Sequence, residues 1–260
     1  MTTFGIIGVG SIASSIVTGL SNGAEPPQIV LSPRTESRSR DLAARFPSAR
    51  VASTNQEVVD QSDVVVLCVL PQQVEKVLEP LVFREDQPLV SAVAGVSLSA
   101  LQDLAAPAKD IARSIPAPAV AARSSITPVY PATNAARDLY DRLGGCLQID
   151  NEVAYEAVSA ASATVEAHFH YLGAVADWLA VHGIPAKDAR RYVAATFCQL
   201  AEEMNTPDAD FGALARAHTT EGGLNEQFAR HLTLNGTFAA VGEGLDAVLA
   251  RLSPSAAPES

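Results

Sequence analysis

The stretch GIIGVGSIA, residues 5–13, decides the fold of this chain. A short apolar run ends in two glycines, Gly8 and Gly10, and a helical pattern follows at once. Glycines at this spacing allow a tight turn and let the backbone approach a pyrophosphate, whose charge then meets the N-terminus of a helix. Ala13 stands where the third glycine of this fingerprint can be alanine. We therefore interpret the stretch as a dinucleotide-binding turn instead of an ordinary strand–turn–helix.

The residues after this turn continue the alternation of apolar runs and helical patterns as far as residue 150. We expect strands at 4–9, 28–32, 63–69, 88–95, 110–115, 126–130 and 146–149. Helices are expected at 11–23, 35–46, 55–61 and 71–81, with a short one near 132–142. Continuous apolar runs are typical of parallel strands that are covered on both faces. The pattern predicts an α/β, doubly wound Rossmann-type domain over residues 1–150.

The character of the chain changes at Asn151, which is a plausible helix N-cap. Beyond it the periodicity is helical throughout. Helices are expected at 152–182, 186–204, 208–217 and 222–251, the last one broken near Gly236. This predicts an all-helical second domain over residues 151–252, followed by a disordered tail at 253–260.

The composition limits the partners that the protein can have. Of the 260 residues 48% are hydrophobic and 18% are charged, and the net charge is −11. An acidic chain is a poor ligand for nucleic acid or an anionic membrane, so we expect neither as a partner. No apolar run is long enough to span a bilayer, and no basic leader precedes the first strand.

The cysteines and histidines exclude other kinds of site. Cys68, Cys146 and Cys198 are few, odd in number and set among apolar residues, which is typical of thiols in a reducing compartment. No group of ligands has the spacing of a metal site, so no metal is expected. We expect a cytoplasmic protein.

The end of the second expected strand favours NADP(H) over NAD. An acidic residue there would bind the ribose 2′-hydroxyl of NAD. This chain has Ser32, Arg34 and Thr35 instead, followed by Ser37 and Arg38. Hydroxyl and guanidinium groups suit a 2′-phosphate. The alternative is that these arginines are ordinary solvated residues at the start of a helix.

Five stretches, in this order, resemble the pyrroline-5-carboxylate reductase family. They are GIIGVGSIASSI (5–16), TNQEVVDQSDVVVLCVLPQ (54–72), SAVAGVSLSAL (91–101), RSIPAPAVAARSSITPVYP (113–131) and TTEGGLNEQ (219–227). The resemblance implies a Rossmann domain followed by a helical domain that forms a homodimer or a higher homo-oligomer. It also implies NAD(P)H-dependent reduction of a small cyclic imine carboxylate, as in the last step of proline synthesis.

The resemblance also implies a set of cofactor contacts. They come from Gly8, Gly10, Ser11, Ile12, Ser32, Arg34, Asn55, Leu70 and Pro71, with Ala94 and Gly95 near the nicotinamide. Several positions depart from the family. Leu70 stands for a lysine, Ala117 for an asparagine, Glu221 for a proline and Asn225 for a threonine. The stretch ASATVEA (161–167) replaces nearly all of a Ser-Gly-Ser-Gly-Pro-Ala-Tyr signature, which leaves the exact substrate open.

The TTEGGLNEQ stretch is the candidate substrate site. Gly222 and Gly223 precede a long helical pattern, where free N–H groups and the helix dipole attract an anion such as a substrate carboxylate. Thr220 can cap the helix or donate to the same carboxylate, and the Asn225 amide can donate toward the substrate nitrogen. The alternative is a helix-breaking turn between two packed helices.

A second candidate lies on the expected helix 152–182, where Glu166 and His170 are four residues apart. A carboxylate that tunes an imidazole makes a proton donor near neutral pH. A structural helix pair or a dimer contact is the alternative. That helix carries no lysine of the kind that related β-hydroxyacid dehydrogenases use, which disfavours alcohol oxidation.

The sequence is therefore compatible with three alternative functions. The first is an enzyme that reduces a C=N bond with NADPH. The second is a reductase of another small carbonyl compound on the same fold. The third is a non-catalytic NADP-binding protein that serves regulation.

Overall fold

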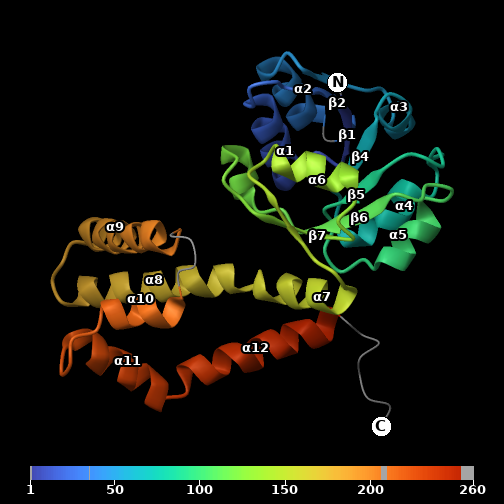
Figure 1. Cartoon of the computed structure of the whole chain (residues 1–260). Helices are drawn as coiled ribbons and strands as arrows, with labels where there is room; N and C mark the ends of the chain where they lie inside the picture. Colours follow the sequence, from blue (N-terminus) through green and yellow to red (C-terminus); the bar gives the residue numbers. More distant parts are fainter. Residues whose placement is uncertain (1, 35, 206–209, 253–260) are drawn as a thin grey trace, which may run out of the picture. The chain divides into compact units, whose positions relative to one another are not determined.

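The computed structural model describes residues 2–34, 36–205 and 210–252 (Figure 1). The chain forms two compact units, Met1–Ser159 and Ala160–Ser260. The boundary expected at residue 150 lies two residues before α7 (Glu152–Ala161), the helix that runs from the first unit into the second.

The first unit contains one eight-stranded sheet with the strand order β3-β2-β1-β4-β5-β6-β7-β8. The strands are β1 (Thr3–Ile7), β2 (Gln28–Leu31), β3 (Ala49–Val51), β4 (Val64–Leu67), β5 (Leu89–Ser91), β6 (Ile111–Ser114), β7 (Thr127–Tyr130) and β8 (Cys146–Gln148). All neighbours pair in parallel except β6 and β7. This is the Rossmann-type sheet that the sequence predicts, with one antiparallel pair added.

Helices cover both faces of this sheet, because alternate residues of each central strand are buried on opposite sides. They are α1 (Ser11–Ser21), α2 (Glu36–Arg45), α3 (Asn55–Asp60), α4 (Val74–Leu78), α5 (Leu98–Leu104) and α6 (Asn134–Asp141). Ile6 belongs to the core shared with α1 and α6, and Ile7 to the core shared with α3, α4 and α5. Figure 1 shows α1 and α6 on one side of the sheet and α4 and α5 on the other.

The structure corrects several sequence-derived elements of this unit. Strand β3 was not expected, because it has only three residues and a polar centre, Arg50, and so shows no hydrophobic period. The helix expected at 71–81 is a 3₁₀ turn (Pro71–Gln73) followed by the short α4. A second 3₁₀ helix, Pro118–Ala122, packs against α1.

The second unit is helical over its described residues. It contains α8 (Thr164–Val181), α9 (Ala186–Met204), α10 (Phe211–Ala217), α11 (Leu224–Leu234) and α12 (Thr237–Leu252). Helix α8 packs against α9, and α11 packs against α12. The break expected near Gly236 is confirmed: this glycine has a φ of 71° and separates α11 from α12. The tail expected at 253–260 lies outside the described residues.

The single helix expected at 152–182 is wrong, because α7 ends at Ala161 and α8 begins at Thr164. The Thr164 hydroxyl donates to the carbonyl oxygen of Ala161 across 2.8 Å, and the Ala163 N–H donates to Ala160 across 3.0 Å. These local bonds compete with the regular helical pattern. Among the described helices, none combines the length and the apolar character that crossing a membrane requires.

Candidate functional site

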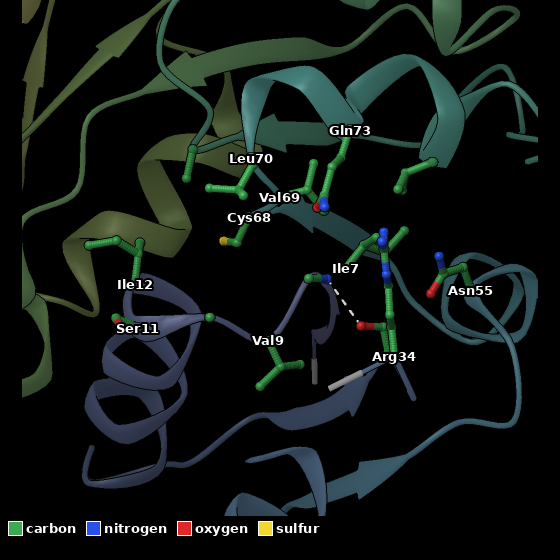
Figure 2. Close-up of a pocket in the computed structure, with 15 residues that line it drawn as sticks. Ile7, Val9, Ser11, Ile12, Arg34, Asn55, Cys68, Val69, Leu70 and Gln73 are labelled. Atoms are coloured by element: carbon green, nitrogen blue, oxygen red, sulfur yellow. Dashed lines mark hydrogen bonds between the residues drawn. The ribbon is translucent and has the colours of Figure 1, made fainter. Parts of the chain in front are cut away.

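A cavity of about 520 Å³ lies at the carboxyl ends of β1 and β4. In an open α/β sheet this edge, next to the turn of the first helix, is the usual place for a ligand. Figure 2 shows Ser11 and Ile12 at one end of the cavity, Arg34 and Asn55 at the other, and Val69 and Leu70 above it. The lining residues are Ile7, Gly8, Val9, Gly10, Ser11, Ile12, Ser32, Arg34, Asn55, Cys68, Val69, Leu70, Gln73, Val77 and Ala92.

The two glycines of the turn have different roles. Gly8 has a φ of 90°, and a Cβ atom there would lie 2.6 Å from Cγ1 of Val69 and 2.7 Å from the carbonyl oxygen of Cys68. The fold itself therefore requires glycine at this position. Gly10 is the N-cap of α1, and a Cβ atom there would meet no protein atom within 4 Å. The space beside Gly10 is therefore open to a ligand at the start of an eleven-residue helix.

Ser32 ties the glycine turn to the end of β2. Its hydroxyl oxygen accepts the Gly8 N–H across 3.0 Å (Figure 2). Its carbonyl oxygen accepts the Ser39 hydroxyl across 2.8 Å. The side chain is buried, so this geometry is rigid. The hydroxyl proton of Ser32 is not used in the bond to Gly8, because the oxygen is the acceptor there.

Arg34 and Asn55 form the opposite end of the cavity. Arg34 follows β2 and is exposed, and no carboxylate in the described part of the chain pairs with it. Asn55 is the first residue of α3, whose N-cap Thr54 accepts the Glu57 N–H across 3.0 Å. Cap and helix fix the backbone from which the Asn55 side chain extends toward Arg34 in Figure 2.

Most of the predicted cofactor residues meet in this cavity, but not all of them. Gly8, Gly10, Ser11, Ile12, Ser32, Arg34, Asn55 and Leu70 line it. Pro71, in the exposed turn after β4, and the exposed Ala94 and Gly95 after β5 do not line it. Thr35 lies outside the described residues.

Sequence reasoning missed several lining residues, among them Cys68, Val69 and Gln73. The strand expected at 63–69 includes Cys68 and Val69, but β4 ends at Leu67, so both residues lie just past the carboxyl end of the strand. That position in a parallel sheet was the signal that could have found them.

Cys68 contributes a neutral thiol to the cavity. Burial raises its pKa to about 12, because the thiolate would lose its hydration. A thiol of this kind is unreactive at neutral pH. It therefore acts as a small apolar contact and not as a nucleophile.

The turn before α11 is the other candidate site, and its polar groups are hydrogen-bonded to one another. The Asn225 amide donates to the carbonyl oxygen of His218 across 2.7 Å, and the His218 ring contacts the Glu203 carboxylate at 2.8 Å. The Gly222 N–H donates to Oε2 of Glu226 across 2.6 Å. The turn thus already holds one carboxylate on a backbone N–H.

The structure corrects the cap of α11. The helix begins at Leu224 and its N-cap is Gly223, not Thr220, with no side chain capping the first turn. Free N–H groups at the start of the helix are therefore left without a side-chain partner. A Cβ atom on Gly223 would lie 2.8 Å from the carbonyl oxygen of Thr220, so close packing in the turn also favours glycine here.

Glu166 and His170 form a contact of 3.4 Å on α8, and their side chains are 88% and 78% exposed. No hydrogen bond or ion pair within the described residues joins this pair to the turn before α11. The described residues also include no group of three histidine, cysteine, aspartate or glutamate side chains that could hold a metal ion.

Comparison with known proteins agrees with this geometry. A family profile described as NADP oxidoreductase, coenzyme F420-dependent, matches residues 3–95. A pyrroline-5-carboxylate reductase of Pseudomonas aeruginosa is 28% identical over 257 residues, which cover 94% of this chain and 93% of the relative. The match therefore includes both units and is not confined to the nucleotide-binding motif.

Solved structures give the same relationship. The 1-pyrroline-5-carboxylate reductase of Streptococcus pyogenes superposes with a TM-score of 0.83 at 26% identity, over 97% of this chain and 98% of that one. The pyrroline carboxylate reductase of Plasmodium falciparum, solved with NADP bound, shares the fold with a TM-score of 0.80 at 16% identity, over 98% of each chain. In sequence along nearly its whole length and in fold, this chain is similar to the pyrroline-5-carboxylate reductases.

Proposed function

We propose that this chain is an NADPH-dependent oxidoreductase that reduces the C=N bond of a small cyclic imine carboxylate, with pyrroline-5-carboxylate as the first candidate substrate. The observation that carries the proposal is the cavity that joins the glycine turn to Arg34, in a chain related to these reductases along both units. A cytoplasmic location is part of the proposal.

The residues of the cavity fit a dinucleotide. Gly10 leaves room for a pyrophosphate at the N-terminus of α1, Gly8 makes the tight turn that precedes it, and the Ser32 hydroxyl and the Arg34 guanidinium suit the ribose end. A bound reduced nicotinamide supplies the hydride for the imine carbon.

The turn before α11 supplies groups for a substrate carboxylate. Backbone N–H groups of its first turn have no side-chain cap, and the neighbouring Gly222 N–H already binds the Glu226 carboxylate. A protonated cyclic imine carries its own proton, so the chain needs no strong general acid. The roles of Asn225, Thr220, Gly222 and Gly223 at the substrate, and those of Glu166 and His170, belong to this proposal.

The test measures NADPH oxidation with three groups of compounds: cyclic imine carboxylates, cyclic imines without a carboxylate, and 2-ketoacids. We expect turnover with the first group, weaker turnover with the second and none with the third. Turnover of ketoacids but not of imines would favour a carbonyl reductase on the same fold. Tight NADPH binding without turnover of any compound would favour a non-catalytic nucleotide-binding protein.

The same proposal includes a homodimer formed through the helical unit. A groove of about 800 Å³ lies between α8 and α12, and its lining is mostly apolar. Phe169 and Val241 in this groove are 66% and 51% exposed. Apolar surface of this extent is typical of an interface. We expect a dimer in sedimentation experiments, and a monomer after Val241→Glu; a wild-type monomer would refute the assembly.

A further inference from the structure

A second cavity of about 510 Å³ adjoins the first and shares Arg34, Asn55 and Val77 with it. None of the glycine-turn residues lines it. Its own residues come from the start of α3, from α4 and from the segment that follows α4. The second cavity therefore extends from the Arg34 end of the first one, away from the place that suits a pyrophosphate.

Two cations face this second cavity, Arg34 after β2 and Lys76 on α4. Both are exposed, and neither forms an ion pair with a carboxylate among the residues that the structure describes. No aspartate or glutamate lines the cavity. In a chain with a net charge of −11, two cations without an ion-pair partner at one cavity favour the approach of an anion.

The other walls of the cavity restrict the kind of anion. Val77, Pro80 and Leu81 give it an apolar side. Thr54 and Gln56 are engaged with protein groups, the first as the cap of α3 and the second with Val82 and Asp60. An apolar wall with a cationic rim suits a phosphate that is carried near a flat aromatic base, such as the adenine of a nucleotide.

We propose that Lys76 is the second cation for the 2′-phosphate of NADPH, acting with Arg34 across the mouth of this cavity. The inference rests on the proposed use of NADPH and adds a specificity-determining residue to it. Lys76 lies 42 positions after Arg34 in the sequence, so only the approach of α4 to the end of β2 brings the two together.

The test compares the full-length wild type with Lys76→Met, in fluorescence titrations with NADPH and NADH. Adenosine 2′,5′-bisphosphate, 5′-AMP and inorganic phosphate serve as competing probes. We expect Lys76→Met to weaken NADPH and adenosine 2′,5′-bisphosphate by about tenfold or more, because one charge-assisted contact is lost. NADH and 5′-AMP should change by less than about twofold, and Lys76→Arg should keep the preference for NADPH.

The matched control is Lys109→Met, since Lys109 is paired with Glu85 and lines neither cavity. It should leave all four nucleotide affinities unchanged. An equal loss of NADPH and NADH affinity in Lys76→Met would place the lysine on the adenine instead, and would overturn the assignment. An unchanged ratio of NADPH affinity to NADH affinity in Lys76→Met would also overturn the assignment. The same holds if the variant weakens NADPH binding only as much as it weakens the binding of inorganic phosphate. Failure of the wild type to bind NADPH would overturn the proposed function as well.

Discussion

Arg113 on β6 donates from Nη2 to Oε1 of Glu156 on α7 across 2.6 Å, and both side chains are buried. A second bond runs from Nη1 to Glu152 at 2.8 Å, and the guanidinium lies 4.4 Å from the centre of the Tyr155 ring. These contacts attach the start of α7 to the sheet of the first unit. Arg113 and Glu156 are 43 residues apart in the sequence.

Replacing Arg113 by methionine should lower the free energy of unfolding by about 3–5 kcal/mol, because a buried carboxylate would lose its partner. Thermal and denaturant unfolding would measure the change. Arg142→Met is the control: its pair with Asp138 is partly exposed and should contribute less than about 1 kcal/mol. Adding Glu156→Leu to Arg113→Met should recover part of the loss. A drop no larger than that of the control would contradict the structural role.

Alanine at Gly8 and at Gly10 should have different effects. Gly8→Ala introduces a Cβ atom 2.6 Å from Val69 at a φ of 90°, so both stability and NADPH affinity should fall. Gly10→Ala meets no protein atom and needs no unusual φ, so the melting temperature should stay nearly unchanged while NADPH affinity falls. Normal NADPH binding by Gly10→Ala would mean that the open space beside this residue is not the pyrophosphate site.

Arg34→Ala should weaken NADPH binding by about 1.5–3 kcal/mol and leave NADH binding nearly unchanged. The reason is the loss of a charge-assisted contact to the 2′-phosphate at the Arg34 end of the cavity. Arg38→Ala is the matched control, since Arg38 follows in the same segment but does not line the cavity. Equal affinity of the wild type for both cofactors would refute the preference for NADPH.

The thiol of Cys68 should resist alkylation at pH 8. Its pKa of about 12 in the folded protein leaves very little thiolate at that pH, whereas Cys198 is exposed. Mass spectrometry after brief treatment with iodoacetamide would locate the label.

The raised pKa of Cys68 also means that, as the pH rises, the unfolded chain loses the thiol proton before the folded chain does. The free energy of unfolding should therefore decrease between about pH 8.5 and pH 12 in the wild type, and less so in Cys68→Ala.

Asn225→Ala should lower the rate of imine reduction and leave NADPH affinity nearly unchanged. Asn235→Ala is a close control, because each amide donates to a histidine carbonyl oxygen across 2.7 Å, His218 for Asn225 and His231 for Asn235. Both variants should lose about 1 kcal/mol of stability. If their values of kcat/KM are equal, Asn225 only shapes the turn before α11.

The local patterns of this chain were sufficient to predict its fold class. Apolar runs that end in a glycine turn predicted β1 and α1, and the helical period predicted the all-helical character of the second half. The pattern failed where an element is short or is interrupted by side-chain bonds. Strand β3 has three residues, and the helix expected at 152–182 is divided where Thr164 bonds to Ala161.

The sequence by itself determined the glycine turn, the absence of an acidic residue after β2 and the resemblance that covers both units, since each of these is a property of neighbouring residues. Only the tertiary structure decided which side chains share a cavity. Lys76 and Arg34 line one cavity, and Glu156 pairs with Arg113, because the parallel sheet and its crossover helices bring together segments about 40 residues apart. Charge pairing and burial depend on distance in space, which no local period encodes.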